Sequence, residues 1–265
     1  MTEALYGYLC DISRLALQFG GRVETILFKP VEGKVATVGQ DPYGNLLIDS
    51  TSKANIPEIT VGGCLHKLNH LSTALTVMGD RKLKAGARIE IETRMASDQK
   101  TLIVGSFTFV TGRTRAQYVT KDPFRAKAGT KVNRVKINKW PTEFHIDAES
   151  VEAFDEAHKV HLSSESASKD DLILLCLEND EIKVRFGEIA AVKSDPKTET
   201  VISRKIMGDK SPYRLILSAA TFRSTMKVMG PDGGIAKLSD HALSIKSESL
   251  HAVYTITLTG KIEEP

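Results

Sequence analysis

The stretches VMGD (residues 77–80) and VMGP (228–231) close two amphipathic helix patterns, one in each half of the chain. A second related pair, RAQYV (115–119) and HAVYT (251–255), closes the last strand pattern of each half. Such a repeat decides the architecture before any single element does. We therefore expect two related domains of similar size.

The order of elements around these stretches is the same in both halves: helix, strands, helix, strands. Apolar residues at helical spacing predict helices over 5–19, 63–78, 148–161 and 219–229. In the third of these we expect Val151, Phe154, Ala157 and Val160 to face inward and Asp147 to be the N-cap. Strands are predicted over 22–28, 33–38, 46–49, 58–61, 87–95, 101–111, 115–120, 172–177, 182–188, 200–207, 213–217, 235–238, 242–246 and 252–258.

Two helices on one face of a mainly antiparallel sheet make each domain an α+β layer structure. The segment over 122–135 is basic and poor in strand formers, so it is expected to connect the two domains. This places domain 1 at 1–121 and domain 2 at 136–265.

The composition is typical of a soluble globular protein, with 41% apolar and 26% charged residues. No run approaches the roughly 20 apolar residues of a membrane-spanning helix, and the start lacks the pattern of a signal peptide. Cys10, Cys64 and Cys176 each lie in an apolar run, which indicates buried thiols in a reducing compartment. We expect an intracellular protein, cytoplasmic or at viral replication sites in an infected host cell.

The charge is unevenly distributed along the chain. Residues 1–135 contain 19 Lys/Arg and 12 Asp/Glu, whereas residues 136–265 contain 17 and 21. An excess of positive charge in the first half suits a polyanionic partner. A dipolar protein without such a partner is an equal alternative.

Motifs for catalysis or cofactor binding are missing from the sequence. It has no glycine-rich phosphate loop, no GxGxxG and no GxSxG. His66 and His70 have the spacing of a two-histidine zinc site, but Lys67 replaces the usual glutamate and no third ligand is evident. His158 and His161 are no stronger as candidate metal ligands. We predict no catalytic residue, no metal and no cofactor, and a binding protein rather than an enzyme.

The arrangement resembles the DNA polymerase sliding clamps of tailed phages and the proliferating cell nuclear antigen. The resemblance covers nearly the whole chain and is carried by ITVGGCLHKL (59–68), AQYVTKDP (116–123), AVYTI (252–256) and GKIEE (260–264). It implies a homotrimeric ring whose helices surround double-stranded DNA. Such a ring would tether the replicative DNA polymerase at high effective concentration and would have a clamp loader as a further partner.

The resemblance also implies contacts between helix-borne cations and DNA phosphates, independent of base sequence. An ordinary solvated charge is the alternative for every candidate. The helix over 148–161 does not fit a positively charged channel wall, because it contains four acidic residues and a single Lys or Arg, Lys159. The DNA-facing candidates are Arg14, His66, Lys67, His70, Arg81, Lys82, Lys84, Lys159, Arg223 and Lys227.

A second site is implied for partner peptides with apolar and aromatic side chains. In this family the pocket lies near the inter-domain connector and the C-terminus. Carried over by position, its lining would include Tyr43, Phe124, Trp140 and Ile262. Trp140 is the sole tryptophan, and a buried core residue is an equal interpretation of it.

Two other functions stay open at this point. The chain could be a duplicated α+β interaction scaffold that associates with DNA without encircling it. It could also be a metal-dependent nuclease with scattered carboxylates. Solution mass separates the ring from the scaffold, and a nuclease assay on linear and circular DNA tests the enzyme.

Overall fold

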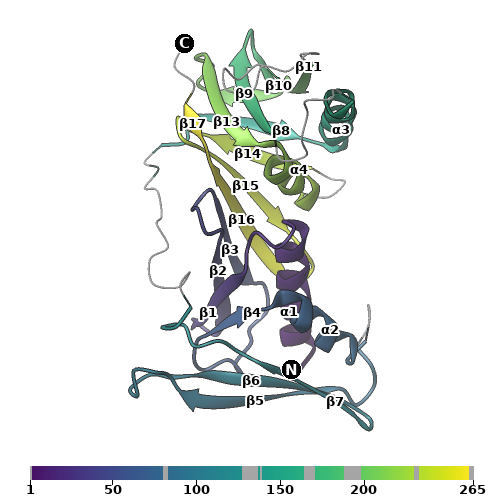
Figure 1. Cartoon of the computed structure of the whole chain (residues 1–265), viewed down its shortest axis with the longest axis vertical. Helices are drawn as coiled ribbons and strands as arrows, with labels where there is room; N and C mark the ends of the chain where they lie inside the picture. The colour runs from purple at the N-terminus through teal and green to yellow at the C-terminus, as the bar shows by residue number, and fades with distance from the viewer. Residues whose placement is uncertain are drawn as a thin grey trace. The chain divides into compact units, whose positions relative to one another are not determined.

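The computed structural model describes residues 2–79, 83–126, 137, 139–163, 171–187, 198–229 and 233–262. These residues form four helices and seventeen strands (Figure 1). All the strand pairs of the sheets described below are antiparallel, which confirms the expected α+β class. The chain divides into two compact units: unit 1 is Met1–Asn133 with Glu248–Tyr254, and unit 2 is Arg134–Ser247 with Thr255–Pro265.

Unit 1 carries two helices and two sheets. One sheet has the order β3-β2-β1-β4 and the other β5-β6-β7. Its core is apolar: Leu9 and Ile12 of the first helix and Phe107 and Phe109 of the second sheet are all buried. The elements are α1 Thr2–Gln18, β1 Thr25–Val31, β2 Lys34–Gln40, β3 Leu46–Ser52, β4 Gly63–His66, α2 Leu68–Thr76, β5 Arg88–Met95, β6 Leu102–Thr111 and β7 Thr114–Val119.

Unit 2 repeats this order with additional strands. Its sheets have the orders β12-β8-β14-β15 and β11-β10-β9-β13-β17. The elements are β8 Thr142–Ile146, α3 Ala148–Leu162, β9 Leu172–Glu178, β10 Glu181–Phe186, β11 Thr198–Ser203, β12 Ile206–Gly208, β13 Tyr213–Ser218, α4 Ala219–Val228, β14 Gly234–Leu238, β15 Ala242–Glu248, β16 Ala252–Thr259 and β17 Lys261–Ile262. The predicted strand over 200–207 is thus two strands, β11 and β12, and β8 was not predicted.

Tight turns join equivalent strands in the two units. Glu32 and Gly33 between β1 and β2, and Asn179 and Asp180 between β9 and β10, all have positive φ angles, between 51° and 79°. Two consecutive residues of positive φ give a turn whose twist matches that of an antiparallel hairpin. This shared turn geometry supports the internal repeat.

The hairpin Glu248–Tyr254 belongs to unit 1, although its sequence position is in the second half. The Ser249 hydroxyl donates to the Asp11 carboxylate of α1 at 2.5 Å. The Lys53 amide donates to the His251 carbonyl at 2.9 Å. These hydrogen bonds are long-range in sequence, so no local pattern could have predicted them.

The prediction of a strand over 58–61 and a helix from residue 63 is wrong. The strand is Gly63–His66, which pairs with β1, and the helix begins at Leu68. Lys67 between them has a left-handed φ of 48°. A Cβ on Gly62 would lie 2.8 Å from the Phe28 carbonyl oxygen, so glycine permits the close strand approach. His66 and His70 therefore do not share a helix.

The inward face of α3 also differs in part from the prediction. Phe154 and Ala157 are buried and Asp147 caps the helix by accepting from the Ser150 amide at 3.0 Å, as predicted. Val160, however, is 51% exposed. His158 and His161 are buried in its place, because both rings pack on Phe186 (centroid distances 5.5 and 5.3 Å).

Candidate nucleic-acid interface

The two helices of unit 1 pack against each other and leave a cavity of about 360 Å³ between them. Arg14 of α1 lines this cavity, together with Gln18 on the same helix and Thr76 on α2. Its guanidinium group lies on the exposed side of α1. Arg14 is therefore placed where a phosphate could approach both helices.

The solvent face of α2 is polar but carries no fixed positive charge. Its exposed residues are Asn69, His70, Thr73 and Thr76. Lys67, immediately before the helix, is also exposed. Lys84 follows the helix and donates from Nζ to the Val77 carbonyl oxygen at 3.2 Å. Cations thus flank α2 rather than cover it.

His66 lies on β4 and is half-buried. Its backbone amide donates to the Tyr118 hydroxyl at 2.6 Å, and that hydroxyl donates to the His66 carbonyl oxygen. Burial, followed by the nearby charges of Lys121 and Lys67, lowers the pKa of the His66 imidazole. Its ordinary pKa is about 6.5, so the ring is neutral at physiological pH and adds no charge for phosphate binding. Arg81 and Lys82 lie outside the described residues.

In unit 2 both cations of α4 are paired with one carboxylate of α3. Arg223 donates from Nε and Nη2 to the two oxygens of Asp155 at 2.5 and 2.9 Å. Lys227 Nζ lies 3.3 Å from Asp155 Oδ2. Such a two-pronged guanidinium–carboxylate pair is strongly oriented. The sequence predicted both cations to be available to DNA, whereas the structure shows them partly neutralised.

The solvent face of α3 is acidic. Glu149, Glu152 and Glu156 are exposed there, and Lys159 is the exposed cation beside them. A phosphate backbone approaching this face would be repelled at short range. The excess of acidic over basic residues noted in the sequence of this helix is therefore also present on the folded surface.

Replacing Asp155 with Asn is expected to lower the free energy of unfolding at neutral pH by less than about 1 kcal/mol, since the pair is solvent-screened. The Arg223 hydrogen bond lowers the pKa of Asp155. The stabilisation is therefore fully present above the unfolded value of about 3.9 and disappears as pH falls through the lower folded value. Thermal unfolding at pH about 7 and about 2 measures this. Glu152→Gln is the control, and an equal loss at both pH values would contradict the linkage.

The residues proposed for a peptide pocket fall in both units. Tyr43 is 86% exposed in the turn after β2, and Phe124 is 51% exposed in the turn that follows β7. Trp140 is half-buried just before β8. Ile262 is in β17, with its backbone opposite Leu215. The shared pocket stays a prediction.

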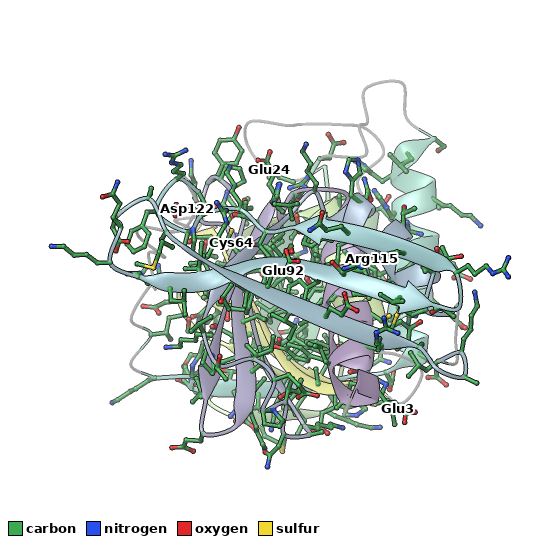
Figure 2. All side chains as sticks on the ribbon, turned by 90° about the horizontal axis from the view of Figure 1, so that it is seen from below. Glu3, Glu24, Cys64, Glu92, Arg115 and Asp122 are labelled. Carbon is green, nitrogen blue, oxygen red and sulfur yellow. The ribbon has the colours of Figure 1, made fainter. Side chains whose placement is uncertain are left out.

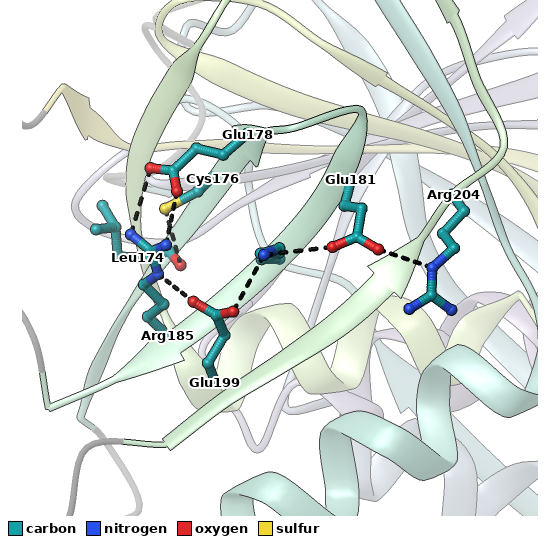
Figure 3. Close-up of polar contacts among 8 residues, drawn as sticks. Leu174, Cys176, Glu178, Glu181, Arg185, Glu199 and Arg204 are labelled. Atoms are coloured by element: carbon teal, nitrogen blue, oxygen red, sulfur yellow. Dashed lines mark hydrogen bonds and ion pairs between the residues drawn. The ribbon is translucent and has the colours of Figure 1, made fainter.

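Charged networks on the sheet surfaces were not predicted. In unit 1, Arg115 of β7 is 2.7 Å from Glu90 of β5, and Figure 2 shows Arg115 and Glu92 on the same three-stranded sheet. In unit 2 a longer network crosses β9, β10 and β11 (Figure 3). Its members, in order of contact, are Glu178, Arg185, Glu199, Lys183, Glu181 and Arg204, with separations of 2.5–3.3 Å.

The sequence does show alternating charges on these neighbouring strands. Which of the charges form pairs can be predicted only when the register between the strands is known. In the register of β10 and β11, Arg185 lies directly opposite Glu199. The hydrogen bond from Arg185 lowers the pKa of Glu199. These cations are compensated within the sheet, so they are poor candidates for phosphate contact.

The described part of the chain contains no group of three or more His, Cys, Asp or Glu side chains arranged to hold a metal ion. None of its helices has the length and apolar character needed to cross a membrane. Cys64 and Cys176 are buried as predicted, and Cys10 is half-buried.

Two α+β units, each with two helices and antiparallel sheets in the same order, define the DNA sliding-clamp fold, and this chain has it. The PCNA (proliferating cell nuclear antigen) of A. fulgidus, solved with the C-terminal region of FEN-1 bound, is similar with a TM-score of 0.65 and 12% identity. The match covers 100% of this chain and 98% of that one.

Two further solved structures show the same fold. The proliferating cellular nuclear antigen of Entamoeba histolytica has a TM-score of 0.63 and 12% identity, over 96% of both chains. The beta clamp of Helicobacter pylori has a TM-score of 0.60 and 13% identity, over 98% of this chain and 64% of that one. No protein-family model and no curated protein matches the sequence. The fold is therefore assigned from similarity to solved structures and not from sequence similarity.

Proposed function

We propose that this protein is a DNA sliding clamp, a homotrimeric ring that encircles duplex DNA and tethers the replicative polymerase. The observation that carries the proposal is the internal repeat of the clamp fold over the whole chain. A ring functions by topology and by effective concentration, so it needs no catalytic group. We therefore expect no enzymatic activity.

From the repeat we infer which strands would close such a ring. In unit 1, β3 has the start of β16 as its outer neighbour. The repeat equivalent of β16 is β7, and that of β3 is β11. Each of these ends its sheet order among the described residues. Pairing β7 of one copy with β11 of the next would reproduce an arrangement that the chain already contains, and would cover both edges.

Contacts with DNA are proposed to be weak and independent of sequence. Arg14, Lys67, Lys84 and Lys159 are exposed cations on or beside the helices, and Lys227 of α4 is also exposed but lies 3.3 Å from Asp155. The acidic face of α3 and the Asp155 pairing reduce the positive charge in unit 2. A ring that stays on DNA by enclosure needs only loose phosphate contacts, whose strength falls with salt.

Partners are proposed to dock through short peptides. The A. fulgidus PCNA structure has the C-terminal region of FEN-1 bound. By analogy, this chain would bind the polymerase and a loader through exposed aromatic residues such as Tyr43 and Phe124.

The proposed ring predicts a solution mass of about three times the 29.0 kDa of one chain. The Thr120 amide donates to Gly105 on β6, so strand alternation turns the Gln117 backbone toward the outer edge of β7. Gln117→Pro removes a donor from that edge and is expected to yield monomers. Gln117→Ala is the matched control and should remain trimeric. Light scattering measures both, and a monomeric wild-type protein would contradict self-closure.

The alternative of a scaffold that does not encircle DNA is favoured by one observation. The face of α3 carries three exposed glutamates, Glu149, Glu152 and Glu156, which a DNA channel would not favour. This alternative predicts that the protein is retained equally on circular and on linear DNA.

A further inference from the structure

An open pocket of about 450 Å³ lies in unit 1, where three strands end. We call it the cation pocket. It shares no lining residue with the cavity between α1 and α2. Its lining includes His66 at the end of β4, Arg94 and Met95 at the end of β5, Val119 at the end of β7, and Lys121 and Arg125 in the turn that follows β7.

Backbone hydrogen bonds hold the walls of this pocket together. Asp122 is buried, and its two carboxylate oxygens accept from the Ser97 amide at 2.6 Å and from the Phe124 amide at 2.9 Å. The Lys121 amide donates to the Cys64 carbonyl oxygen of β4 at 2.9 Å, and Figure 2 shows Cys64 and Asp122 close together. The turns after β5 and β7 and the end of β4 are therefore fixed to one another.

The Arg94 side chain is positioned by two contacts. Its Nη2 atom donates to the Thr120 carbonyl oxygen at 3.2 Å. Its aliphatic part crosses Gly105 of β6, where an added Cβ would lie 3.0–3.4 Å from three of the Arg94 carbons. Glycine at this position thus leaves the room that the arginine side chain occupies.

The positive charges of the pocket are not neutralised by ion pairs. Among the described residues, Arg94, Lys121 and Arg125 take part in no ion pair. Of the described residues that line the pocket, Asp122 alone is acidic. With His66 neutral, three cations and one carboxylate leave a net charge of +2. A phosphate monoester, which carries about −1.5 to −2 at neutral pH, matches this charge.

The pocket also offers an apolar surface. Met95 and Val119 are 51% and 54% exposed, and both belong to the lining. The volume lies within the range of about 300–1,000 Å³ that is typical of ligand pockets. A pocket of this size admits a single side chain or a small molecule. Its ligand would therefore combine an anionic group with an apolar body.

We propose that the cation pocket binds an aromatic phosphate monoester. The phosphate lies between Arg94, Lys121 and Arg125, because guanidinium groups bind phosphate in a two-pronged geometry. The aromatic ring lies against Met95 and Val119. Phosphotyrosine is the modified side chain with this chemistry. The inference rests neither on ring formation nor on contact with DNA.

The first test uses a fluorescein-labelled peptide with one phosphotyrosine between glycines. Fluorescence anisotropy with the full-length protein at about 0.15 M salt is expected to show saturable binding. The same peptide with unmodified tyrosine should bind at least about tenfold more weakly, because the charge-assisted hydrogen bonds to the phosphate are lost. Absence of binding by the phosphopeptide, or equal binding by both peptides, overturns the proposal.

Unlabelled competitors identify the source of the phosphate. Inorganic phosphate should be at least about tenfold less effective than phenyl phosphate, because it lacks the ring. Phenyl phosphate that competes as well as the unlabelled phosphopeptide assigns a free small molecule as the ligand, and a more effective phosphopeptide assigns a protein side chain. Equal competition by inorganic and phenyl phosphate overturns the proposal. Displacement by a short DNA duplex as efficient as that by the phosphopeptide also overturns it, because the pocket would then be part of a DNA-contacting surface.

The second test locates the site on the protein. Arg125→Gln removes one charge of the pocket and should weaken phosphopeptide binding about tenfold. Arg125 is exposed, so the fold should be unaffected. Arg113→Gln is the matched control, since it removes the same charge from the exposed turn between β6 and β7, at the other end of β7. It should bind as the wild type does, and an equal loss in both variants overturns the proposal.

His66 provides a readout that depends on pH. Burial, followed by the nearby charges of Lys121, Lys67 and His70, lowers the pKa of its imidazole. An anion beside Lys121 offsets this repulsion and raises the pKa of the His66 ring, so anion binding takes up a proton. Burial opposes the ionisation of Asp122, but its hydrogen bonds to backbone amides lower its pKa, so it stays ionised near neutral pH. The Arg and Lys side chains of the pocket also keep their charge there.

The third test measures this coupling by calorimetry with phenyl sulfate, whose own charge is constant. Its affinity should rise as the pH falls from about 7.5 to about 5.5, because the bound state favours the protonated ring of His66. His66→Asn should abolish this pH dependence, and His70→Asn, which removes the exposed neighbouring histidine, should retain it. A pH dependence that persists in His66→Asn overturns the proposal, because the anion would then bind elsewhere.

Discussion

Linearising a circular plasmid is expected to release this protein from the DNA. Phosphate contacts weaken steeply with salt, whereas enclosure of a closed circle does not depend on them. At raised salt, retention on the circle should therefore exceed retention on the linear form by on the order of tenfold. Gel filtration of protein assembled on nicked circular and linearised plasmid measures the two fractions.

The β7 edge variant supplies the control for this experiment. Gln117→Pro should be retained equally poorly on both DNA forms, and Gln117→Ala should behave as the wild type. Equal retention of the wild type on circular and linear DNA supports the non-encircling scaffold instead. Retention on neither form contradicts a ring that opens and loads unaided. Cleavage of the circle in the presence of a divalent metal would support the nuclease.

Replacing Phe154 with Ala is expected to destabilise unit 2 by about 3–5 kcal/mol. Phe154 is fully buried, and its ring centroid lies 5.3 Å from Phe186 and 5.4 Å from Phe222. The truncation leaves a cavity beneath α3 that these rigid rings cannot fill. Denaturant unfolding followed through Trp140, the sole tryptophan and a residue of unit 2, measures the loss.

The same helix offers a matched control. Val160→Ala removes an apolar side chain that is mostly in solvent, so it should change the free energy of unfolding by no more than about 0.5 kcal/mol. If Val160→Ala lowered the free energy of unfolding as much as Phe154→Ala, the observed orientation of α3 would be contradicted. The inward face predicted from the sequence, which includes Val160, would then be supported.

The helix α3 shows what the spacing of apolar residues can predict and what it cannot. Helical spacing correctly placed Phe154 and Ala157 in the core, because burial of apolar side chains dominates helix orientation. Val160 was misplaced because the pattern treats histidine as polar. The His161 ring nitrogen is hydrogen-bonded to Asp171 at 2.8 Å and the ring packs on Phe186, so its burial is compensated. Such compensation depends on a partner from another element.

The candidate DNA site was less accessible to sequence reasoning. Exposed cations such as Arg14 and Lys159 were found correctly as surface residues. Arg223 was taken as available because its partner, Asp155, lies 68 positions away. His66 was assigned to a helix because local apolar spacing outweighed the glycines that admit a strand. Whether any of these residues contacts DNA stays a prediction.

The sequence by itself determined the duplication, the α+β class and the helical stripes, because these follow from the spacing of apolar residues along the chain. Only the tertiary structure decided which charges are paired and that the hairpin Glu248–Tyr254 belongs to unit 1. The physical reason is the same in each case. Hydrogen bonds, ion pairs and strand edges depend on which distant segments meet, and that information is absent from any local pattern.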